Sequence, residues 1–148
     1  MPIRSAVVAD DEFLNRDLLV EILGRLGLQV RAVKDGVQAL KALEDELADL
    51  LITDIRMPGM GGMKLLLKAR EKWPGLPVVM MTAFSSVESA VQCMREGAYD
   101  YLTKPFGVEQ VEALLLRLNE RQVLVREVQT LRDEVRDRHR ERKFLGQS

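Results

Sequence analysis

A regular alternation of short apolar runs with longer segments of helical period is the feature that most constrains how this chain can fold. The apolar runs are rich in branched aliphatic residues, as in strands covered by helices on both faces of a parallel sheet. The segments between them are long enough for right-handed crossover helices. The predicted strands are residues 3–9, 28–33, 50–53, 78–81 and 99–102, and the predicted helices are residues 13–26, 37–46, 63–73 and 86–96. The pattern therefore predicts an α/β fold around a five-stranded parallel sheet.

Residues at the ends of the predicted helices support these boundaries. Gly27 and Gly97 follow the first and fourth helices, at the position where glycine commonly ends a helix. Asp35 and Ser86 stand at the start of the second and fourth helices, where a side-chain oxygen can accept a hydrogen bond from a free backbone amide. We therefore expect these four residues to act as helix stops and N-caps.

Composition and charge exclude several classes of function. The 148 residues include 22 basic and 23 acidic side chains and give a net charge of -1, which is not the balance of a protein that coats nucleic acid. With one cysteine, Cys93, and one histidine, His139, the chain cannot form an internal disulfide, a thiolate zinc cage or a multi-histidine metal site. Any metal ion must therefore be bound by oxygen ligands.

The chain also lacks the sequence features of membrane and secreted proteins. Its longest apolar run, residues 76–81, contains a proline and is far shorter than the roughly 20 residues that span a bilayer. The first five residues do not open a signal peptide. We therefore expect a soluble, cytoplasmic protein with no membrane partner.

The C-terminal part of the chain has a different pattern. Between Gly107 and Gly146 there is neither glycine nor proline, and basic and acidic residues are mixed along this stretch. The apolar residues at near-heptad spacing are Val111, Leu115, Leu118, Val125, Val128, Leu131 and Val135. This spacing predicts that the last helix of the domain continues as a dimerising coiled coil, although a solvated single helix or a disordered tail remains an alternative. The mixed charge argues against a DNA-binding basic region.

Acidic residues lie where two of the predicted strands end. Asp10 and Asp11 follow the first strand, and Asp54 follows the third. Because the carboxyl ends of parallel strands face a common crevice, these three carboxylates should converge there. Converging carboxylates repel one another and are usually neutralised by a hard cation, for which oxygen-only ligands with room for water favour Mg²⁺. Each aspartate taken alone could instead cap the following turn or helix.

Thr82 and Lys104 come at the ends of the fourth and fifth strands, so they should face the same crevice. A hydroxyl and an ammonium beside a magnesium site suit a phosphoryl group, whose transfer depends mostly on positioning and charge neutralisation. A salt bridge from Lys104 to one of the aspartates is compatible with that role. The next residue, Pro105, predicts a tight turn with either peptide isomer.

Four short motifs give the sequence a specific resemblance. Residues 10–12 (DDE), 54–59 (DIRMPG), 81–83 (MTA) and 104–105 (KP) resemble the motifs of bacterial two-component response regulator receiver domains. The resemblance covers residues 1 to about 120. It implies a flavodoxin-like, doubly wound sheet with the strand order 2-1-3-4-5. Gly61 and Gly62 stand in place of the acidic residue and glycine that often follow this family's Met-Pro-Gly turn, which could loosen that loop.

The resemblance also implies roles for the acidic residues. Asp54 would be the phosphoacceptor, a carboxylate nucleophile that receives a phosphoryl group from a phosphohistidine of a sensor histidine kinase. Asp11, Asp54 and the backbone carbonyl of Arg56 would bind Mg²⁺ directly. Asp10 would act on the ion mainly through water.

Further roles implied by the resemblance fall on the later strands. Thr82, Lys104 and the backbone amide of Ala83 would bind the phosphoryl oxygens. Tyr101 occupies the family's aromatic switch position, from which the ring can move inward when Thr82 turns toward the phosphoryl group. The domain would then act in signalling and would assist only its own phosphorylation and dephosphorylation.

Two further segments resemble the activators of sigma-54 polymerase. These are residues 82–91 (TAFSSVESAV) and the closing residues 144–148 (FLGQS). The resemblance implies a receiver domain at 1–120, a coiled-coil linker helix at 121–143 and the start of an absent AAA+ ATPase domain at 144–148. It also implies a homodimer through the last receiver helix and the linker helix. Lacking a nucleotide-binding loop and a helix-turn-helix, this fragment should bind neither ATP nor DNA by itself.

Three other functions are compatible with parts of the pattern. A phosphatase or mutase with an aspartyl nucleophile needs a second acid two residues later, where this chain has Arg56. A stand-alone receiver that acts by binding a target protein is a second alternative, and the long tail with its ATPase-like ending argues against it. A degenerate receiver that serves as a constitutive scaffold would have lost at least one of the acids, the threonine or the lysine, and all are present.

Overall fold

A computed structural model describes residues 3–83 and 87–120 of the chain. The chain divides into two compact units, of which the first is Ile3–Ala113. The described part of the second unit is residues 114–120, which are helical. The predicted linker at 121–143, the residues 144–148 and Ser86 lie outside the described residues.

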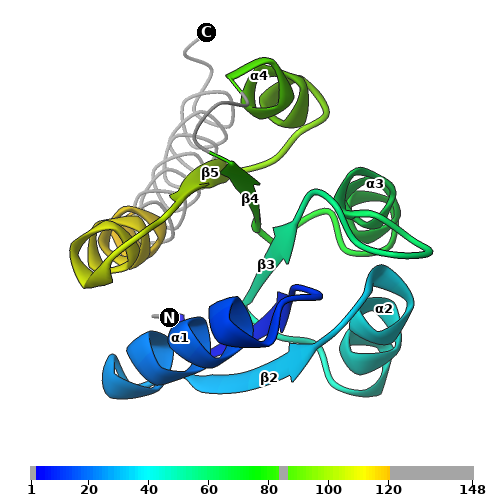
Figure 1. Ribbon diagram of the computed structural model, residues 1–148. Coiled ribbons are helices and arrows are strands. Elements are labelled where there is room, and N and C mark those ends of the chain that lie inside the picture. The colour runs from blue at the N-terminus through cyan, green and yellow to red at the C-terminus, as the bar shows by residue number, and fades with distance from the viewer. Residues whose placement is uncertain (1–2, 84–86, 121–148) are drawn as a thin grey trace, which may run out of the picture. The chain divides into compact units, whose positions relative to one another are not determined.

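The first unit is built on a five-stranded parallel sheet with the order β2-β1-β3-β4-β5, as Figure 1 shows. The strands are β1 (Ser5–Ala9), β2 (Gln29–Val33), β3 (Leu50–Asp54), β4 (Val78–Ala83) and β5 (Asp100–Lys104). The predicted α/β class and strand order are therefore confirmed. The order reverses direction at β1, which places the crevice of such a sheet between β1 and β3.

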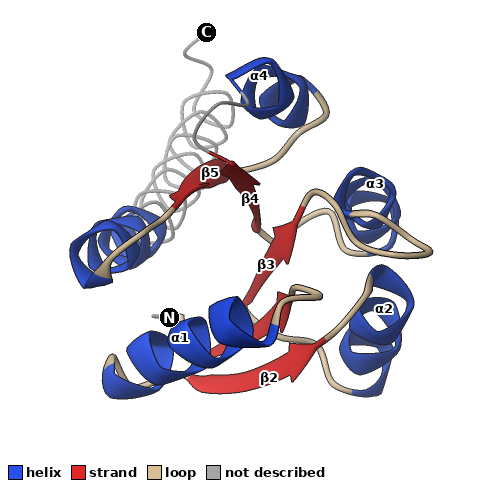
Figure 2. Ribbon diagram, in the orientation of Figure 1, coloured by secondary structure: helices blue, strands red, loops and turns tan. Residues whose placement is uncertain are grey.

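Helices connect the strands and cover both faces of the sheet. They are α1 (Phe13–Arg25), α2 (Gly36–Asp45), α3 (Gly62–Lys72) and α4 (Val87–Arg95), and residues 108–120 form a further helix. In Figure 2, α1 lies on one face and α2, α3 and α4 lie on the other. Within the described residues, no helix combines the length and the hydropathy that a membrane span requires.

The core lies along the three inner strands. Every residue of β3 before Asp54 is buried, and so are residues 6–9 of β1 and 78–82 of β4. The expectation of strands covered on both faces holds for these three but is wrong for β2 and β5, whose residues are largely half-buried or exposed. As edge strands, β2 and β5 have a neighbour on one side only. On the edge strand β2, Arg31 donates a hydrogen bond of 2.6 Å to the carbonyl of Ala42 in α2.

The helix ends agree with the sequence. The Asp35 carboxylate accepts a hydrogen bond of 2.8 Å from the Gln38 amide and so caps α2. Gly27 and Gly97 have φ angles of 94° and 101°, in the left-handed region where glycine is favoured. The predicted cap and both predicted stops are therefore confirmed.

Three strands run further than predicted, and each ends on a polar residue or next to one. β3 ends at Asp54, β4 continues past Thr82 to Ala83, and β5 ends at Lys104. Parallel pairing explains the extension, because Thr82 lies opposite Thr103 and Ala83 lies opposite Lys104 in the β4–β5 register. The ladder thus fixes the backbone of these residues at the carboxyl edge of the sheet.

Candidate functional site

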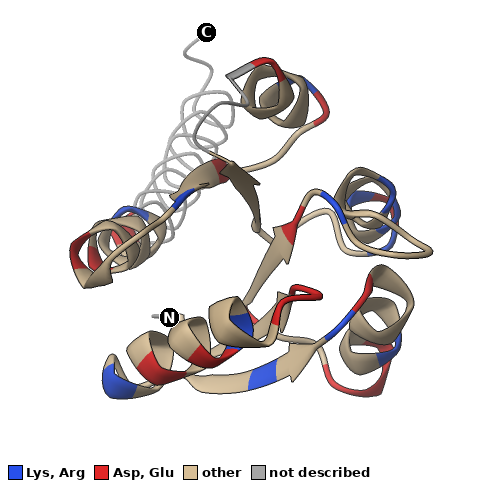
Figure 3. Ribbon diagram, in the orientation of Figure 1, with Lys and Arg blue, Asp and Glu red and all other residues tan. Residues whose placement is uncertain are grey.

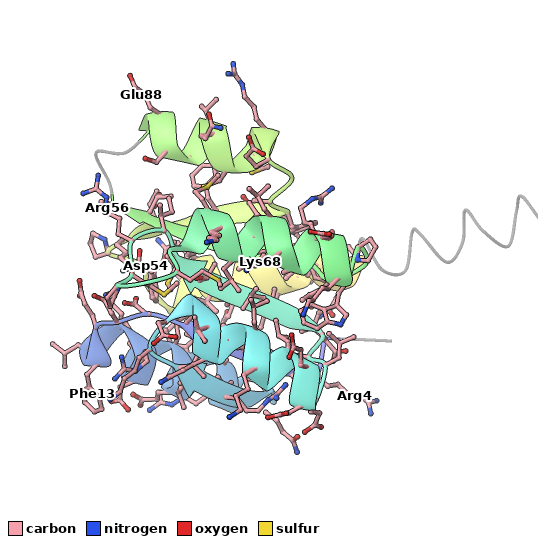
Figure 4. All side chains as sticks on the ribbon, turned by 90° about the vertical axis from the view of Figure 1, so that its right-hand side faces the viewer. Arg4, Phe13, Asp54, Arg56, Lys68 and Glu88 are labelled. Atoms are coloured by element: carbon pink, nitrogen blue, oxygen red, sulfur yellow. The ribbon has the colours of Figure 1, made fainter. Side chains whose placement is uncertain are left out.

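The polar residues at the strand ends gather at one edge of the sheet. Figure 3 shows acidic residues where β1 and β3 end. In Figure 4, Asp54 and Arg56 lie at one side of the domain, and Arg4, which precedes β1, lies at the opposite side. The candidate site is therefore built on the carboxyl ends of the parallel strands, where the amide and side-chain groups beyond the sheet are free to meet a ligand.

Three carboxylates converge at this edge. Asp10, Asp11 and Asp54 each offer an oxygen, and these oxygens lie within 4.8 Å of one another. Asp10 is completely buried, Asp54 is half-buried and Asp11 is exposed. Two like charges about 4 Å apart repel by about 4 kcal/mol at an effective dielectric constant of about 20, and exposure lowers this cost for Asp11. The predicted cluster is confirmed, and it requires positive charge nearby.

Lys104 supplies part of that charge. Its Nζ donates to Asp10 Oδ2 over 3.0 Å and to Asp54 Oδ2 over 3.1 Å. Burial opposes the charge on Lys104, but the hydrogen bonds and the charges of the two aspartates outweigh it and raise the pKa of the lysine. One ammonium thus joins the ends of β1, β3 and β5. The peptide bond that follows, between Lys104 and Pro105, is cis.

The charge of the Asp54 carboxylate is only partly compensated by its surroundings. Burial raises its pKa above the ordinary value, and the charge of Asp10 raises it further. The hydrogen bond and charge of Lys104 and a hydrogen bond from the Arg56 backbone act in the opposite direction without cancelling the burial. Asp54 is therefore a carboxylate that gains from additional positive charge.

Asp10 is held in place by contacts that the sequence did not reveal. Its Oδ1 accepts a hydrogen bond of 2.9 Å from the Glu12 amide, and its backbone carbonyl accepts one of 2.7 Å from Arg16 Nη1 on α1. The guanidinium also lies over the Phe13 ring, 5.8 Å from its centroid. No sequence motif marks Arg16, since its contact depends on how the first turn of α1 packs against the end of β1.

Thr82 contributes a hydroxyl without an acceptor. The side chain is 2 % exposed, and its Oγ1 has no hydrogen-bond partner among residues 3–83 and 87–120. A buried polar group without a partner costs about 1 to 3 kcal/mol, so it must be compensated elsewhere or by a ligand. Because Thr82 lines the same pocket as Asp54 and Lys104, an oxygen of a bound anion would satisfy it.

The structure brings most of the predicted site residues into one pocket. Those that line it are Asp11, Asp54, Arg56, Thr82, Ala83 and Lys104, with Glu12, Ile55, Met81 and Ser89 also at its wall. No sequence motif predicts the contribution of Ser89, which comes from α4. Tyr101 is not among the lining residues; it lies on β5 and is 42 % exposed.

The residues present fit a hard divalent cation. The donor set consists only of oxygens, and the exposed Asp11 leaves room for water ligands, as Mg²⁺ prefers. Lys104 offsets one of the three negative charges, which leaves an excess that a dication would neutralise. The remaining ammonium and hydroxyl groups suit an anion beside the cation, and a phosphoryl group meets both conditions.

An open parallel sheet with polar residues at this edge belongs to the class of doubly wound α/β proteins, which place their ligands at the carboxyl ends of the strands. Comparison with known families identifies the class further: the model of the response regulator receiver domain matches residues 6–116, and the chain belongs to that family. It is the receiver domain of a response regulator, a signalling domain. The resemblance read from the four motifs is thereby confirmed.

Relatives among known proteins agree. The chain is 41 % identical over 110 residues to the DNA-binding transcriptional regulator NtrC of Escherichia coli K12, covering 74 % of this chain and 24 % of that protein. It is 36 % identical over 112 residues to the response regulator protein PilR of Pseudomonas aeruginosa, covering 76 % and 25 %. The chain thus spans about a quarter of the length of these relatives.

Solved structures share the fold. NtrX from Brucella abortus, crystallised with ADP, superposes with a TM-score of 0.82 at 36 % identity, covering 88 % of this chain and 30 % of that one. A response regulator receiver domain protein from Clostridium thermocellum gives a TM-score of 0.77 at 25 % identity and covers 83 % and 99 %. The fold class is therefore confirmed by independent structures.

The raised pKa of Asp54 predicts that its ionisation lowers the free energy of unfolding. In acid, below the ordinary value of 3.8, the group is protonated in both states and no charge is buried. As the pH rises through the higher pKa of the folded protein, the unfolded chain has already released the proton, so the folded state loses stability. We therefore expect metal-free Asp54→Asn to resist urea better than the wild type at neutral pH, and this advantage to vanish in acid.

The control for this measurement is Asp45→Asn, the same replacement at an exposed position at the end of α2. It should leave the urea midpoint close to that of the wild type at both pH values. Lower stability of Asp54→Asn at neutral pH, or an advantage of the same size at every pH, would contradict the assignment of a burial cost to the Asp54 charge.

Proposed function

We propose that Asp54 accepts a phosphoryl group from a phosphohistidine of a sensor histidine kinase. A carboxylate oxygen of Asp54 attacks phosphorus, the bond from phosphorus to the imidazole nitrogen breaks, and the nitrogen keeps the electron pair. The product is an acyl phosphate on Asp54 and a free imidazole on the kinase. The observation that carries this proposal is the meeting of the Asp54 carboxylate, the Lys104 ammonium and the unpartnered Thr82 hydroxyl in one pocket.

Mg²⁺ fits the acidic cluster, where Asp11, Asp54 and the backbone carbonyl of Arg56 would bind it and Asp10 would act through water. When bound, the ion supplies positive charge that neutralises the oxygens of the incoming group. Asp10 already binds Lys104 and the Glu12 amide, so its role toward the ion is to hold charge close by without leaving these partners. The chain itself orients the nucleophile, since the β3 ladder fixes the backbone of Asp54.

The phosphoryl oxygens would be bound by Thr82, Lys104 and the backbone amide of Ala83. The hydroxyl of Thr82 gains the acceptor that it lacks, and Lys104 exchanges its contact with Asp54 for one with a phosphoryl oxygen while keeping Asp10. These donors come from the ends of β4 and β5, so their positions are set before the group arrives. Such preorganised donors favour transfer because they need little rearrangement.

Tyr101 would carry the signal from the pocket to the surface. The Tyr101 ring is partly exposed on β5, and Thr82 lies on the neighbouring β4. Movement of Thr82 toward a phosphoryl group would open space for the ring to turn inward. Phosphorylation would then shift the population between two arrangements of the surface around Tyr101.

We expect Asp54→Asn to abolish phosphorylation by acetyl phosphate, because the amide is not a competent nucleophile. Intact-mass measurement should show one phosphoryl group on the wild type in the presence of Mg²⁺, removed by hydroxylamine as expected for an acyl phosphate. Chelation of the metal should prevent the labelling. The control Asp45→Asn should be labelled like the wild type, and a label that persists on Asp54→Asn would show that another residue is the acceptor.

At the level of the whole protein, we propose that this receiver belongs to an activator of sigma-54 polymerase. The similarity to the transcriptional regulator NtrC supports this assignment. The receiver would span residues 1–120, a coiled-coil linker would span 121–143, and residues 144–148 would begin an AAA+ ATPase domain. The protein would act in the cytoplasm, with the kinase, a second copy of the chain and its own ATPase as partners.

We further propose that phosphorylation changes which dimer the chain favours through its last receiver helix and linker. Beryllofluoride binds to the carboxylate oxygen of an aspartate and mimics an aspartyl phosphate. It should therefore shift the dimerisation constant of the wild type. Analytical ultracentrifugation with and without beryllofluoride and Mg²⁺ measures this shift, and Asp54→Asn should show none. An identical association constant and small-angle scattering profile in both states would remove the proposed coupling.

A further inference from the structure

Gly36, the first residue of α2, lies in close contact with the loop that follows the phosphoacceptor. Its backbone amide donates to the Met60 carbonyl over 3.3 Å. A Cβ atom placed on Gly36 would lie 2.7 Å from that carbonyl oxygen and 2.8 Å from Met60 Cγ. Figure 1 shows the β3–α3 loop (residues 55–61) passing beside an end of α2. The absence of a side chain at position 36 therefore allows the loop to rest directly on the helix.

A side chain at position 36 would displace the loop more readily than the helix. α2 is held by the Asp35 cap and by the buried side chains of Ala39 and Leu43. In the loop, Arg56, Pro58 and Gly59 are exposed, whereas Ile55, Met57 and Met60 are half-buried and pack against the core. A close contact between the helix and this partly exposed loop is relieved by movement of the loop, because the helix is held by its cap and buried side chains and three of the loop residues are exposed.

The loop transmits such a displacement to the pocket. Its far end is tightly folded back, since the Gly62 amide donates to the Ile55 carbonyl over 2.8 Å and a Cβ on Gly62 would lie 2.0 Å from the Asp54 carbonyl oxygen. Gly61 and Gly62 thus allow a close backbone contact with Asp54 and Ile55. Ile55 and Arg56 line the pocket, and the Arg56 backbone hydrogen-bonds the Asp54 carboxylate.

We propose that Gly36 is a positioning residue of the acidic pocket. Because Gly36 has no Cβ, the Met60 carbonyl can lie against its backbone, and this contact fixes the position of the loop that holds Arg56 beside Asp54. The inference rests on the proposed Mg²⁺ site. It assigns a role in that site to Gly36, which does not line the pocket. α2, which contributes no lining residue to the pocket, thereby fixes the geometry of one of its sides. Affinity for the cation should depend on this contact as metal sites depend on the groups that orient their ligands.

The test is the Mg²⁺ affinity of Gly36→Ala, measured by isothermal titration calorimetry on folded protein. We expect binding about tenfold weaker than in the wild type, the low end of the range for groups that orient metal ligands. Hydrogen exchange of the metal-free protein should also be faster at residues 55–60. Because φ of Gly36 is not positive, alanine fits the helical backbone, and the effect should arise from the contact with Met60.

Gly24→Ala is the matched control. Gly24 lies within α1, and a Cβ there would meet no atom within 4 Å. Alanine should raise the urea midpoint of the protein, because it favours the helix over glycine, and leave the Mg²⁺ affinity unchanged. Equal affinities of Gly36→Ala and the wild type would overturn the inference while leaving the metal site intact. Failure of the wild type itself to bind Mg²⁺ would instead contradict the proposed function.

A second variant keeps the inference testable if Gly36→Ala does not fold. Met60→Ala removes Cγ, one of the atoms that a Cβ at position 36 would approach, but leaves the carbonyl in place. The double variant with Gly36→Ala should bind Mg²⁺ more weakly than Met60→Ala alone, because the contact with the carbonyl remains. If the single Gly36→Ala does fold, the double variant should recover part of its lost affinity. Equal affinities of Met60→Ala and the double variant would overturn the inference.

Discussion

The ion pairs of Lys104 with Asp10 and Asp54 are the interaction on which the site depends. They join the ends of β1, β3 and β5, because Lys104 is 94 residues from Asp10 and 50 residues from Asp54 in the sequence. Without this ammonium, the repulsion between Asp10 and Asp54 would be opposed mainly by the hydrogen bonds that the Glu12 amide and the Arg56 backbone make with them. Lys104 offsets only part of the charge, and the raised pKa of Asp54 shows that burial is not fully compensated. The pocket thus combines an excess of negative charge with an ammonium and an unpartnered buried hydroxyl.

Much of the fold could be predicted because the local and the global patterns agree. The apolar runs mark the inner strands, and Asp35, Gly27 and Gly97 mark helix ends that the backbone geometry confirms. The predicted strands stop short of the observed ends of β3, β4 and β5, because the apolar pattern ends at a polar residue whereas the parallel ladder continues through it. The edge position of β2, with its exposed and half-buried residues, follows from topology rather than from the sequence of the strand.

The acidic cluster and its lysine could also be predicted, because strand ends of a parallel sheet share one edge. The residues around them could not. Arg16 reaches the Asp10 carbonyl from α1, Ser89 comes from α4, and Gly36 contacts the Met60 carbonyl. Each of these contacts joins segments by packing, which leaves no local pattern of residue types. Gly61 and Gly62 show the same limit, since their effect depends on the carbonyls of Asp54 and Ile55 that they approach.

The most direct test of the account is to locate a divalent cation in the pocket. Crystals grown with Mn²⁺ in place of Mg²⁺ allow the ion to be placed from its anomalous scattering. The account predicts one strong peak with Asp11 and Asp54 among its ligands and Lys104 still in contact with Asp10. A fully ordered pocket with no peak at saturating Mn²⁺, or an ion bound elsewhere, would contradict the central claim that these carboxylates form a cation site.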